Sequence, residues 1–315
     1  MQLRNVVLIL FILLSITGLF AQQDKLITNF MYDKMSINPG KTGIDMNNSI
    51  CATSIYRNQW DKVNGAPNSA VLNIEGNFST FFKGGLGLAF YHDAIGFSRQ
   101  NNLLLNYSYP IQIGDVGVLG IGVGIGIINY GIEPNWVPPT SINDPSLPKG
   151  FAATNLDANF GAYFQGKDFY AGLSSTHLSE SLLKKSVDGL DQNYQTARHY
   201  YLMGGKTFDD VLNGRIDAQV LMRTDLIKLS FDLNTRYFYS LNNHDLYGGL
   251  SYRNSDAIAV LFGYSPIDRF TVGYSYDITI NKLSSVSRGS HEILFKYCFN
   301  LPEPKSSYSR NPRWL

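Results

Sequence analysis

Cysteine and charged residues are both scarce in this sequence. Its 315 residues include only 2 Cys, which is too few for a disulfide framework to hold the fold together. Charged residues make up 16% of the chain, and 26 Lys and Arg stand against 25 Asp and Glu. This balance lacks the basic surface that nucleic-acid binding requires, so we expect no nucleic-acid partner. After residue 21, no apolar run reaches the ~20 residues of a transmembrane helix.

The one long apolar run stands at the start of the chain. Arg4 precedes it, Val6 to Phe20 are almost wholly apolar, and Ala21 is followed by the polar Gln22. A charged start, an apolar middle and a small residue at the cleavage point predict a secretory signal peptide over residues 1–21, which is then removed. The alternative is an uncleaved N-terminal anchor.

Apolar and polar residues alternate through most of the mature chain, which is rich in Tyr (20), Phe (19) and Gly (29). Every even-numbered residue from Phe270 to Ile280 is apolar or aromatic, whereas the odd-numbered ones are Thr, Gly, Ser, Asp and Thr. The stretch from Leu229 to Tyr239 repeats this pattern. Because successive side chains on a strand point to opposite faces, each stretch predicts a β-strand with one apolar and one polar face.

About fourteen such segments follow one another, each near the ~9–11 residues of a tilted membrane strand. They lie near residues 48–60, 70–82, 85–96, 101–113, 117–130, 155–165, 169–178, 199–208, 214–223, 228–240, 245–253, 257–265, 270–280 and 290–299. An even number of strands is expected for a single-chain bacterial barrel. The sequence therefore predicts an all-β fold, a transmembrane antiparallel β-barrel of about 14 strands over residues 48–299.

The connections between the segments differ in length. Lys83–Gly84, Gly114–Val116 and Gly166–Asp168 are tight turns, whereas 61–69 and 131–154 are longer. Short periplasmic turns and longer extracellular loops are typical of barrels in the outer membrane of Gram-negative bacteria, so we expect a multi-pass protein of the cell outer membrane, surrounded by its lipid.

This threading starts and ends in the periplasm. Residues 22–47 are then a periplasmic N-terminal segment, with folding into the barrel as the alternative, and residues 300–315 are a periplasmic C-terminal tail.

A secreted soluble β-protein is the main alternative, because turning the sheet inside out gives the same alternation. The leader, the number of strands and the aromatic residues beside the short turns favour the membrane barrel, since amphipathic rings prefer the headgroup level. These aromatic residues are Phe81, Phe82, Phe164, Phe169, Tyr170, Phe208, Tyr237, Tyr239, Phe262, Tyr264, Phe270 and Phe299.

Motifs for catalysis or metal binding are not found in the sequence. The 5 His do not form a His-x-x-x-His pair, and no Gly-x-Ser-x-Gly elbow occurs. We therefore expect no enzyme activity and no catalytic, cofactor-binding or metal site. Charged residues on the predicted inner faces are expected to pair across strands, because burial of an isolated ion is costly, with a solute path as the alternative. They are Glu75, Asp157, Asp217, Asp232, Arg236, Asp277, Glu292 and Lys296.

Two further features leave alternatives open. The glycines that alternate from Gly120 to Gly126 indicate barrel curvature, which we favour, or close approach of another backbone such as a plug or a folded-in terminus. Cys51 and Cys298 lie on the first and last predicted strands, which are neighbours where a barrel closes. The periplasm permits a disulfide, but cross-strand pairs seldom meet disulfide geometry, so we favour two unpaired residues.

Several short motifs carry a family resemblance. Tyr56-Arg57-Asn58-Gln59-Trp60, followed by Gly65-Ala66-Pro67, resembles the PorP/SprF family of type IX secretion system membrane proteins, found in the Bacteroidota. Phe30-Met31-Tyr32 with Ile37-Asn38-Pro39 is similar to the family's mature N-terminus, although Gly40 to Gly43 depart from it. Matches to the last hairpin and the terminal tail stand at Gly273-Tyr274-Ser275-Tyr276-Asp277, Gly289-Ser290-His291-Glu292 and Asn311-Pro312-Arg313-Trp314-Leu315.

The resemblance implies an outer-membrane component of the type IX secretion system. Such a protein supports export or surface anchoring of a partner by binding, the partner being a gliding adhesin or other cargo with a C-terminal sorting domain. The resemblance also implies contact with periplasmic ring or motor components. The residues by themselves allow a second function, a passive porin or a channel for small or apolar solutes.

The residues of the family signature are also the candidates for partner contact. Trp60 is expected near the outer membrane interface, and Arg57 and Gln59 share a strand face that suits either a partner or a network of hydrogen bonds at the rim. The tail ends in Arg, Trp and a carboxylate, which suits capture by a partner or tucking into the barrel mouth. The full set is Tyr56, Arg57, Gln59, Trp60, Gly65, Pro67, Arg313, Trp314 and Leu315.

Overall fold

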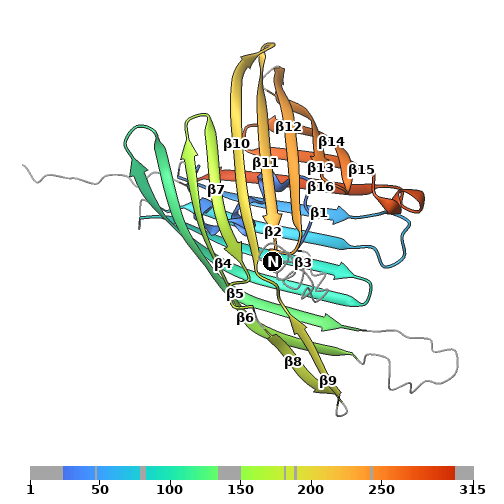
Figure 1. Cartoon of the computed structure of the whole chain (residues 1–315). Helices are drawn as coiled ribbons and strands as arrows, with labels where there is room; N and C mark the ends of the chain where they lie inside the picture. Colours follow the sequence, from blue (N-terminus) through green and yellow to red (C-terminus); the bar gives the residue numbers. More distant parts are fainter. Residues whose placement is uncertain are drawn as a thin grey trace, which may run out of the picture.

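The computed structural model of the chain describes residues 24–46, 48–78, 83–133, 150–180, 182–187, 190–241 and 244–301 (Figure 1). Its strands are β1 (Ser49–Asn58), β2 (Asn68–Asn77), β3 (Gly85–Ile95), β4 (Ser98–Ile113), β5 (Gly117–Ile132), β6 (Phe151–Gly166), β7 (Phe169–Thr176), β8 (Leu182–Val187), β9 (Leu190–Gln195), β10 (His199–Val211), β11 (Gly214–Thr224), β12 (Leu229–Leu241), β13 (His244–Arg253), β14 (Ala257–Ile267), β15 (Phe270–Thr279) and β16 (Ser290–Asn300). The short helical elements are η1 (Phe30–Tyr32), α2 (Lys34–Ile37), η2 (Pro39–Lys41) and η3 (Lys282–Ser285).

All strands except β8 and β9 form one closed antiparallel barrel of 14 strands. The barrel closes between its first and last strands, where Ser49 lies opposite Asn300 and Asn58 lies opposite His291. Each barrel strand thus has a partner on both sides, which supplies hydrogen bonds that lipid cannot give to the backbone. The predicted all-β membrane barrel is confirmed, and the strands begin and end within a few residues of their predicted positions.

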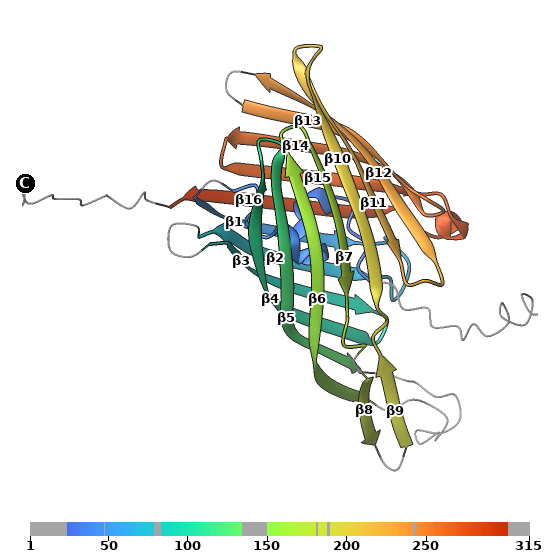
Figure 2. The ribbon, with the colours of Figure 1, turned by 60° about the vertical axis from the view of Figure 1, so that its left-hand side comes forward.

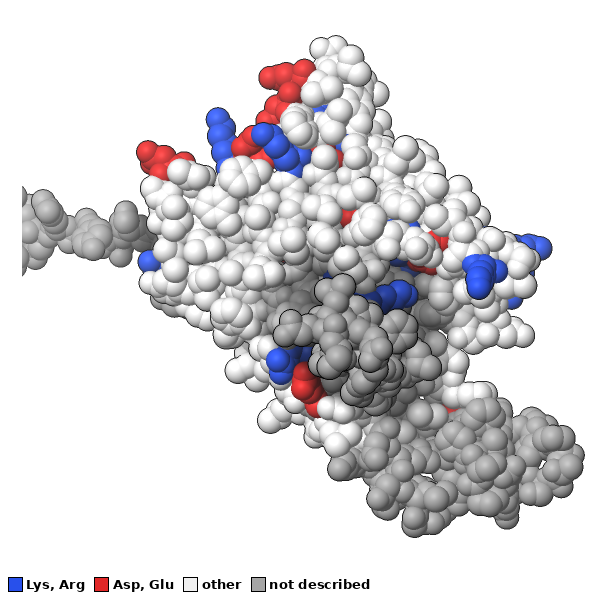
Figure 3. All heavy atoms as spheres, viewed as in Figure 1, with Lys and Arg blue, Asp and Glu red and all other residues white. Residues whose placement is uncertain are grey.

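The apolar face of the strands points outward. On β15, Tyr274 and Ile278 are exposed, whereas Ser275 and Asp277 are buried inside the barrel. Figure 3 shows a broad surface without Lys, Arg, Asp or Glu beside a charged edge. This arrangement is that of a membrane barrel and the reverse of a soluble one. Tyr170 departs from the prediction for the aromatic girdle, because its ring is 8% exposed and packs inside the barrel.

The two ends of the barrel differ in the length of their connections. The short-turn end carries 78–84, 114–116, 167–168, 212–213, 242–243 and 268–269. The long-loop end carries 59–67, 96–97, 133–150, 177–198, 225–228, 254–256 and 280–289. One of the long connections contains the β8–β9 hairpin, which forms a separate two-stranded sheet (Figure 1) and was not expected from the sequence. Among the described residues, the helical elements are all too short to cross a membrane.

Cys51 and Cys298 form a disulfide, so the expectation of two unpaired residues was wrong. The two residues are directly opposite each other in the register of β1 and β16, with 4.0 Å between their Cα atoms. Residues directly opposite each other on antiparallel strands lie close together, so their side chains can reach each other and form the disulfide. The disulfide therefore links the two strands at the seam where the barrel closes.

Candidate functional site

Residues 24–46, which we call the lumen segment, lie inside the barrel, where Figure 2 shows their helical turns between the strands. The apolar side chains of Ile27, Phe30 and Met35 each enter a different buried cluster together with residues of the barrel wall. Full burial of such a side chain contributes ~1.5–3 kcal/mol. The lumen segment is therefore packed as a core.

A charged clamp holds the backbone of the lumen segment. The carboxylate of Glu292 accepts hydrogen bonds from the backbone N–H groups of Thr28 and Asn29, both at 2.8 Å. Arg57 lies against the same carboxylate at 3.2 Å and pairs with Asp277 at 2.7 Å. The Thr28 hydroxyl completes the clamp by donating to Asp277 at 2.8 Å and accepting from Arg57 at 2.9 Å. Because all five side chains are buried, each charge depends on its partners.

The ion pairs continue along the wall from this clamp. Arg253 lies 3.7 Å from Asp277 and 2.7 Å from Asp232, which also pairs with Arg223. Arg223 in turn donates to the backbone carbonyl of Lys25, at 3.4 Å. A line of alternating charges therefore runs along the wall from Thr28 and Asn29 to Lys25.

The other part of the lumen segment rests on glycines of the wall. A Cβ atom on Gly40 would lie 2.7 Å from the carbonyl oxygen of Gly120, and one on Gly122 would overlap Pro39. For Gly120 and Gly122, the expectation of simple barrel curvature was therefore wrong. The absent side chains leave the space in which the backbone of the lumen segment approaches the wall.

Two lysines of the lumen segment have different electrostatic surroundings. Lys41 pairs with Glu75 at 2.6 Å and with Asp45 at 3.0 Å. The Nζ atom of Lys34 lies 3.6 Å from the centre of the Tyr170 ring instead of beside a carboxylate. Lys34 is thus held by aromatic rings, those of Tyr163 and Tyr170, and Lys41 by carboxylates.

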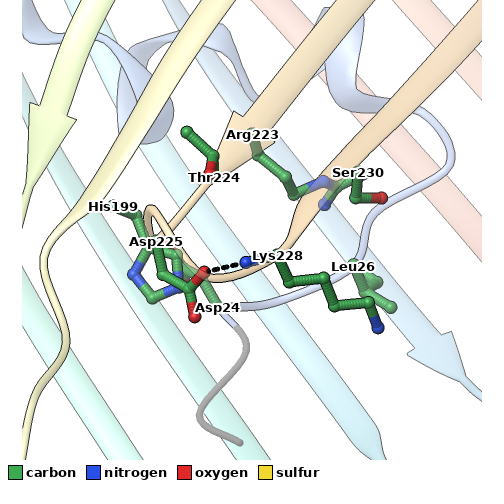
Figure 4. A pocket seen from close by; sticks show the side chains of 8 residues that line it. All are labelled: Asp24, Leu26, His199, Arg223, Thr224, Asp225, Lys228 and Ser230. Atoms are coloured by element: carbon green, nitrogen blue, oxygen red, sulfur yellow. Dashed lines mark hydrogen bonds between the residues drawn. The ribbon is translucent and has the colours of Figure 1, made fainter. Parts of the chain in front are cut away.

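The lumen segment begins in a small pocket at the long-loop end (Figure 4). Asp24 and Leu26 face His199, Arg223 and the β11–β12 connection there. This cavity measures about 30 Å³, and two others beside the segment measure about 10 and 20 Å³. A cavity of that size holds a water molecule or two and nothing larger. The described lumen segment thus fills the interior at this mouth.

The structure separates the residues of the predicted signature. Tyr56 is exposed on the outer face of β1, whereas Arg57 is 1% exposed and belongs to the clamp. Gln59 is buried at the rim, and its backbone N–H donates to the carbonyl of Pro67 at 2.9 Å. Trp60 and Gly65 lie on the same connection, 59–67, and both have a positive φ.

The remaining members of the predicted site, Arg313, Trp314 and Leu315, lie outside the described residues, as does the leader over residues 1–21.

Thr28 and Asn29 were missed as functional residues by sequence reasoning. The pairing of inner-face charges could be expected from the cost of burying an ion, and Asp157 indeed pairs with His177 and Asp217 with Arg236. Nothing in the alternation indicates that Glu292 binds backbone groups 264 and 263 positions away. The one available signal was the match of Phe30-Met31-Tyr32, directly after Asn29, to the N-terminal motif of the resembled family.

Solved structures with a similar fold are outer-membrane barrels. The Pseudomonas putida toluene transporter TodX matches with a TM-score of 0.53 and 11% identity, over 88% of this chain and 95% of that one. The Ralstonia pickettii toluene transporter TbuX has a TM-score of 0.52 and 13% identity, over 85% and 93%. The CymD monoaromatic hydrocarbon channel has a TM-score of 0.51 and 11% identity, over 86% and 93%. At these identities the likeness concerns the fold alone.

A comparison with curated proteins found no match. The family described as type IX secretion system membrane protein PorP/SprF matches residues 19–297, which include the lumen segment and nearly all of the barrel. The match agrees with the motifs at Tyr56–Trp60 and Gly273–Asp277, and it places the protein in the outer membrane. The chain belongs to the PorP/SprF family of type IX secretion system membrane proteins.

Proposed function

We propose that this protein supports the export or surface anchoring of a partner protein, by binding. The observation that carries the proposal is the lumen segment, which fills the barrel and is held by buried ion pairs. A filled and ion-paired interior suits a scaffold better than an open pore. Family membership supplies the secretion context, and it suggests a non-enzymatic role.

The partners we propose are those of a secretion machine. They are cargo with a C-terminal sorting domain, such as a gliding adhesin, and periplasmic ring or motor components. We place the long-loop end outside the cell, because outer-membrane barrels carry their longer loops there. The tail over residues 300–315 then lies in the periplasm, within reach of ring or motor components, and a cleaved leader over residues 1–21 delivers the chain to that compartment.

Deletion of the gene tests this function directly. We expect one or a few surface proteins to disappear from the surface proteome and to return when the full chain is supplied again. A second strain, with a chain that lacks residues 311–315, tests the proposed role of Arg313, Trp314 and Leu315. An unchanged surface proteome after gene deletion would contradict the proposal.

A passive channel for small or apolar solutes is the second candidate. It is favoured by the fold likeness to barrels described as toluene transporters and a hydrocarbon channel. Single-channel recording and liposome swelling with the purified chain separate the two candidates. The scaffold predicts no steady conductance and no swelling, whereas a passive channel predicts at least one of them.

A further inference from the structure

A polar cavity of about 430 Å³ opens at the long-loop end, away from the lumen segment. It lies between the 59–67 connection and the beginning of β4, and we call it the rim cavity. Its polar and aromatic lining includes Asn58, Trp60, Asp61, Lys62, Asn64 and Arg99.

The backbone that forms the rim cavity is fixed by its neighbours on both sides. Asp61 exchanges backbone hydrogen bonds with the 280–289 connection, donating to Gly289 at 2.7 Å and accepting from Arg288 at 2.9 Å. On the other side, Gly96 donates to the carbonyl of Gly65 at 2.9 Å. Trp60 (φ 51°) and Lys62 (φ 73°) are held in a conformation that such residues rarely adopt. Strain of this kind persists where the surroundings impose it, and it is commonly found at functional sites.

Three polar side chains of the rim cavity are left without protein partners, whereas Arg99 donates to the carbonyls of Gly96 and Ser98, both at 2.9 Å. Within the described part of the chain, no hydrogen bond or ion pair engages the side chains of Asn58, Asn64 or Lys62. The backbone N–H groups of Gln59, Asp61 and Val63, in contrast, all donate to carbonyls of the protein. The cavity therefore offers side-chain amides and charges to a ligand, but few free backbone groups.

We propose that the rim cavity binds a saccharide. Amide and carboxylate side chains hydrogen-bond the hydroxyl groups of a sugar, the Trp60 ring can pack against its C–H groups, and Lys62 and Arg99 suit a phosphate or carboxylate attached to it. The volume falls in the range of about 300–1,000 Å³ that is usual for small-ligand sites. A peptide that adds a strand needs free backbone groups, and an apolar solute needs an apolar wall, so neither fits this cavity.

The saccharide can come from two sources at the cell surface, the lipopolysaccharide of the surrounding membrane or a glycan on a secreted protein. The binding site is independent of the secretion role proposed above, so either conclusion can fail while the other stands.

Binding of two glycan probes to the purified full-length chain tests the proposal. The probes are the delipidated polysaccharide of the cell's own lipopolysaccharide and glycopeptides released by protease from its secreted proteins, each measured by calorimetry. We expect binding of at least one probe. The Asn58→Ala and Asn64→Ala double variant should bind about tenfold more weakly, because the hydroxyl groups lose their partners. Asn129→Ala is the matched control, since it removes an amide that faces Thr154 on the outer wall.

The outcomes separate the two sources and also allow the proposal to fail. Binding of the polysaccharide alone assigns the cavity to lipopolysaccharide, and binding of the glycopeptides alone assigns it to a glycosylated partner. Heat-modifiable migration in a gel shows that each variant is folded. Should a variant of Asn58 not fold, Asn64→Ala and Lys62→Ala alter exposed side chains of the connection and carry the test. Absence of binding by the wild type, or equal binding by wild type and folded cavity variants, would overturn the proposal.

Discussion

At the scale of single residues, the carboxylate of Glu292 joins three distant parts of the chain. It binds the backbone of Thr28 and Asn29, and it lies 3.2 Å from Arg57 on the neighbouring strand. Charges taken out of water are stable only while their partners remain, so this contact helps to fix the position of the lumen segment.

Replacement of Arg57 should therefore destabilise the protein strongly. In Arg57→Met, Glu292 keeps its hydrogen bonds but loses its counter-ion, and we expect the free energy of unfolding to fall by about 3–5 kcal/mol. Urea titration followed by heat-modifiable migration measures this change. Lys206→Met is the control, because Lys206 pairs with Asp168 at the exposed surface, where a pair contributes about 0–1 kcal/mol. Equal losses in both variants would contradict the assignment of the clamp.

At the scale of elements, the strands could be predicted from the sequence and the contents of the lumen could not. A period of two residues is a local pattern, and it gave the positions and the outward face of β12 and β15. The helical turns of the lumen segment are 3 or 4 residues long, too short to show a helical period. The disulfide joins residues 247 positions apart, and the β8 sequence LLKKSV does not alternate. The contacts of the lumen segment and the disulfide depend on the fold as a whole.

The two faces of β15 should respond alike to a new charge, for different reasons. Tyr274→Arg places a charge in lipid, at a cost of up to ~2–4 kcal/mol near the midplane. Ser275 lies on the polar face, but it is fully buried and 3.3 Å from the amide of Asn29, so Ser275→Arg should also prevent assembly. Thr271→Arg, on the same face at the short-turn end, is the tolerated control. Outer-membrane fractions on a gel measure the amount of folded barrel. Normal assembly of Ser275→Arg would contradict a filled lumen.

The seam between β1 and β16 should lose stability when its disulfide is removed. The bond restricts an unfolded loop of 247 residues, and disulfides typically contribute about 2–4 kcal/mol. We expect the Cys51→Ser and Cys298→Ser double variant to unfold at lower urea than the oxidised wild type and at the same urea as the reduced wild type. Identical midpoints of the oxidised wild type and the variant would show that the strand pairing alone holds the seam.

At the scale of the whole molecule, the barrel and its lumen segment form one closed body. The segment contributes side chains to three apolar clusters, and the cavities around it have volumes of about 10–30 Å³. The wall alone would enclose a polar space, because the inner faces of the strands carry the charges. We therefore expect the segment, and not the wall, to keep the barrel closed to solutes.

Deletion of residues 24–46 should convert the closed barrel into a conducting one. We expect steady single-channel conductance from the shortened chain and none from the wild type, measured in planar bilayers at the same protein concentration. The Asn29→Ala variant, which removes one amide from the clamp and keeps the segment, serves as the control and should remain closed. Conductance of equal size from the wild type would mean that the segment leaves a path through the barrel.

The direction of the lumen segment restricts the order in which the protein assembles. Asp24 accepts a hydrogen bond from Tyr201 near the long-loop end, whereas Thr42 and Gly43 lie against Gly85 at the short-turn end, shortly before β1 begins. The segment thus passes through the barrel from one mouth to the other, with wide side chains along its length. A finished barrel would have to admit it end first through a space that it almost fills. We therefore expect the sheet to curl around a segment already in place, with the pairing of β16 and β1 enclosing it as the last step.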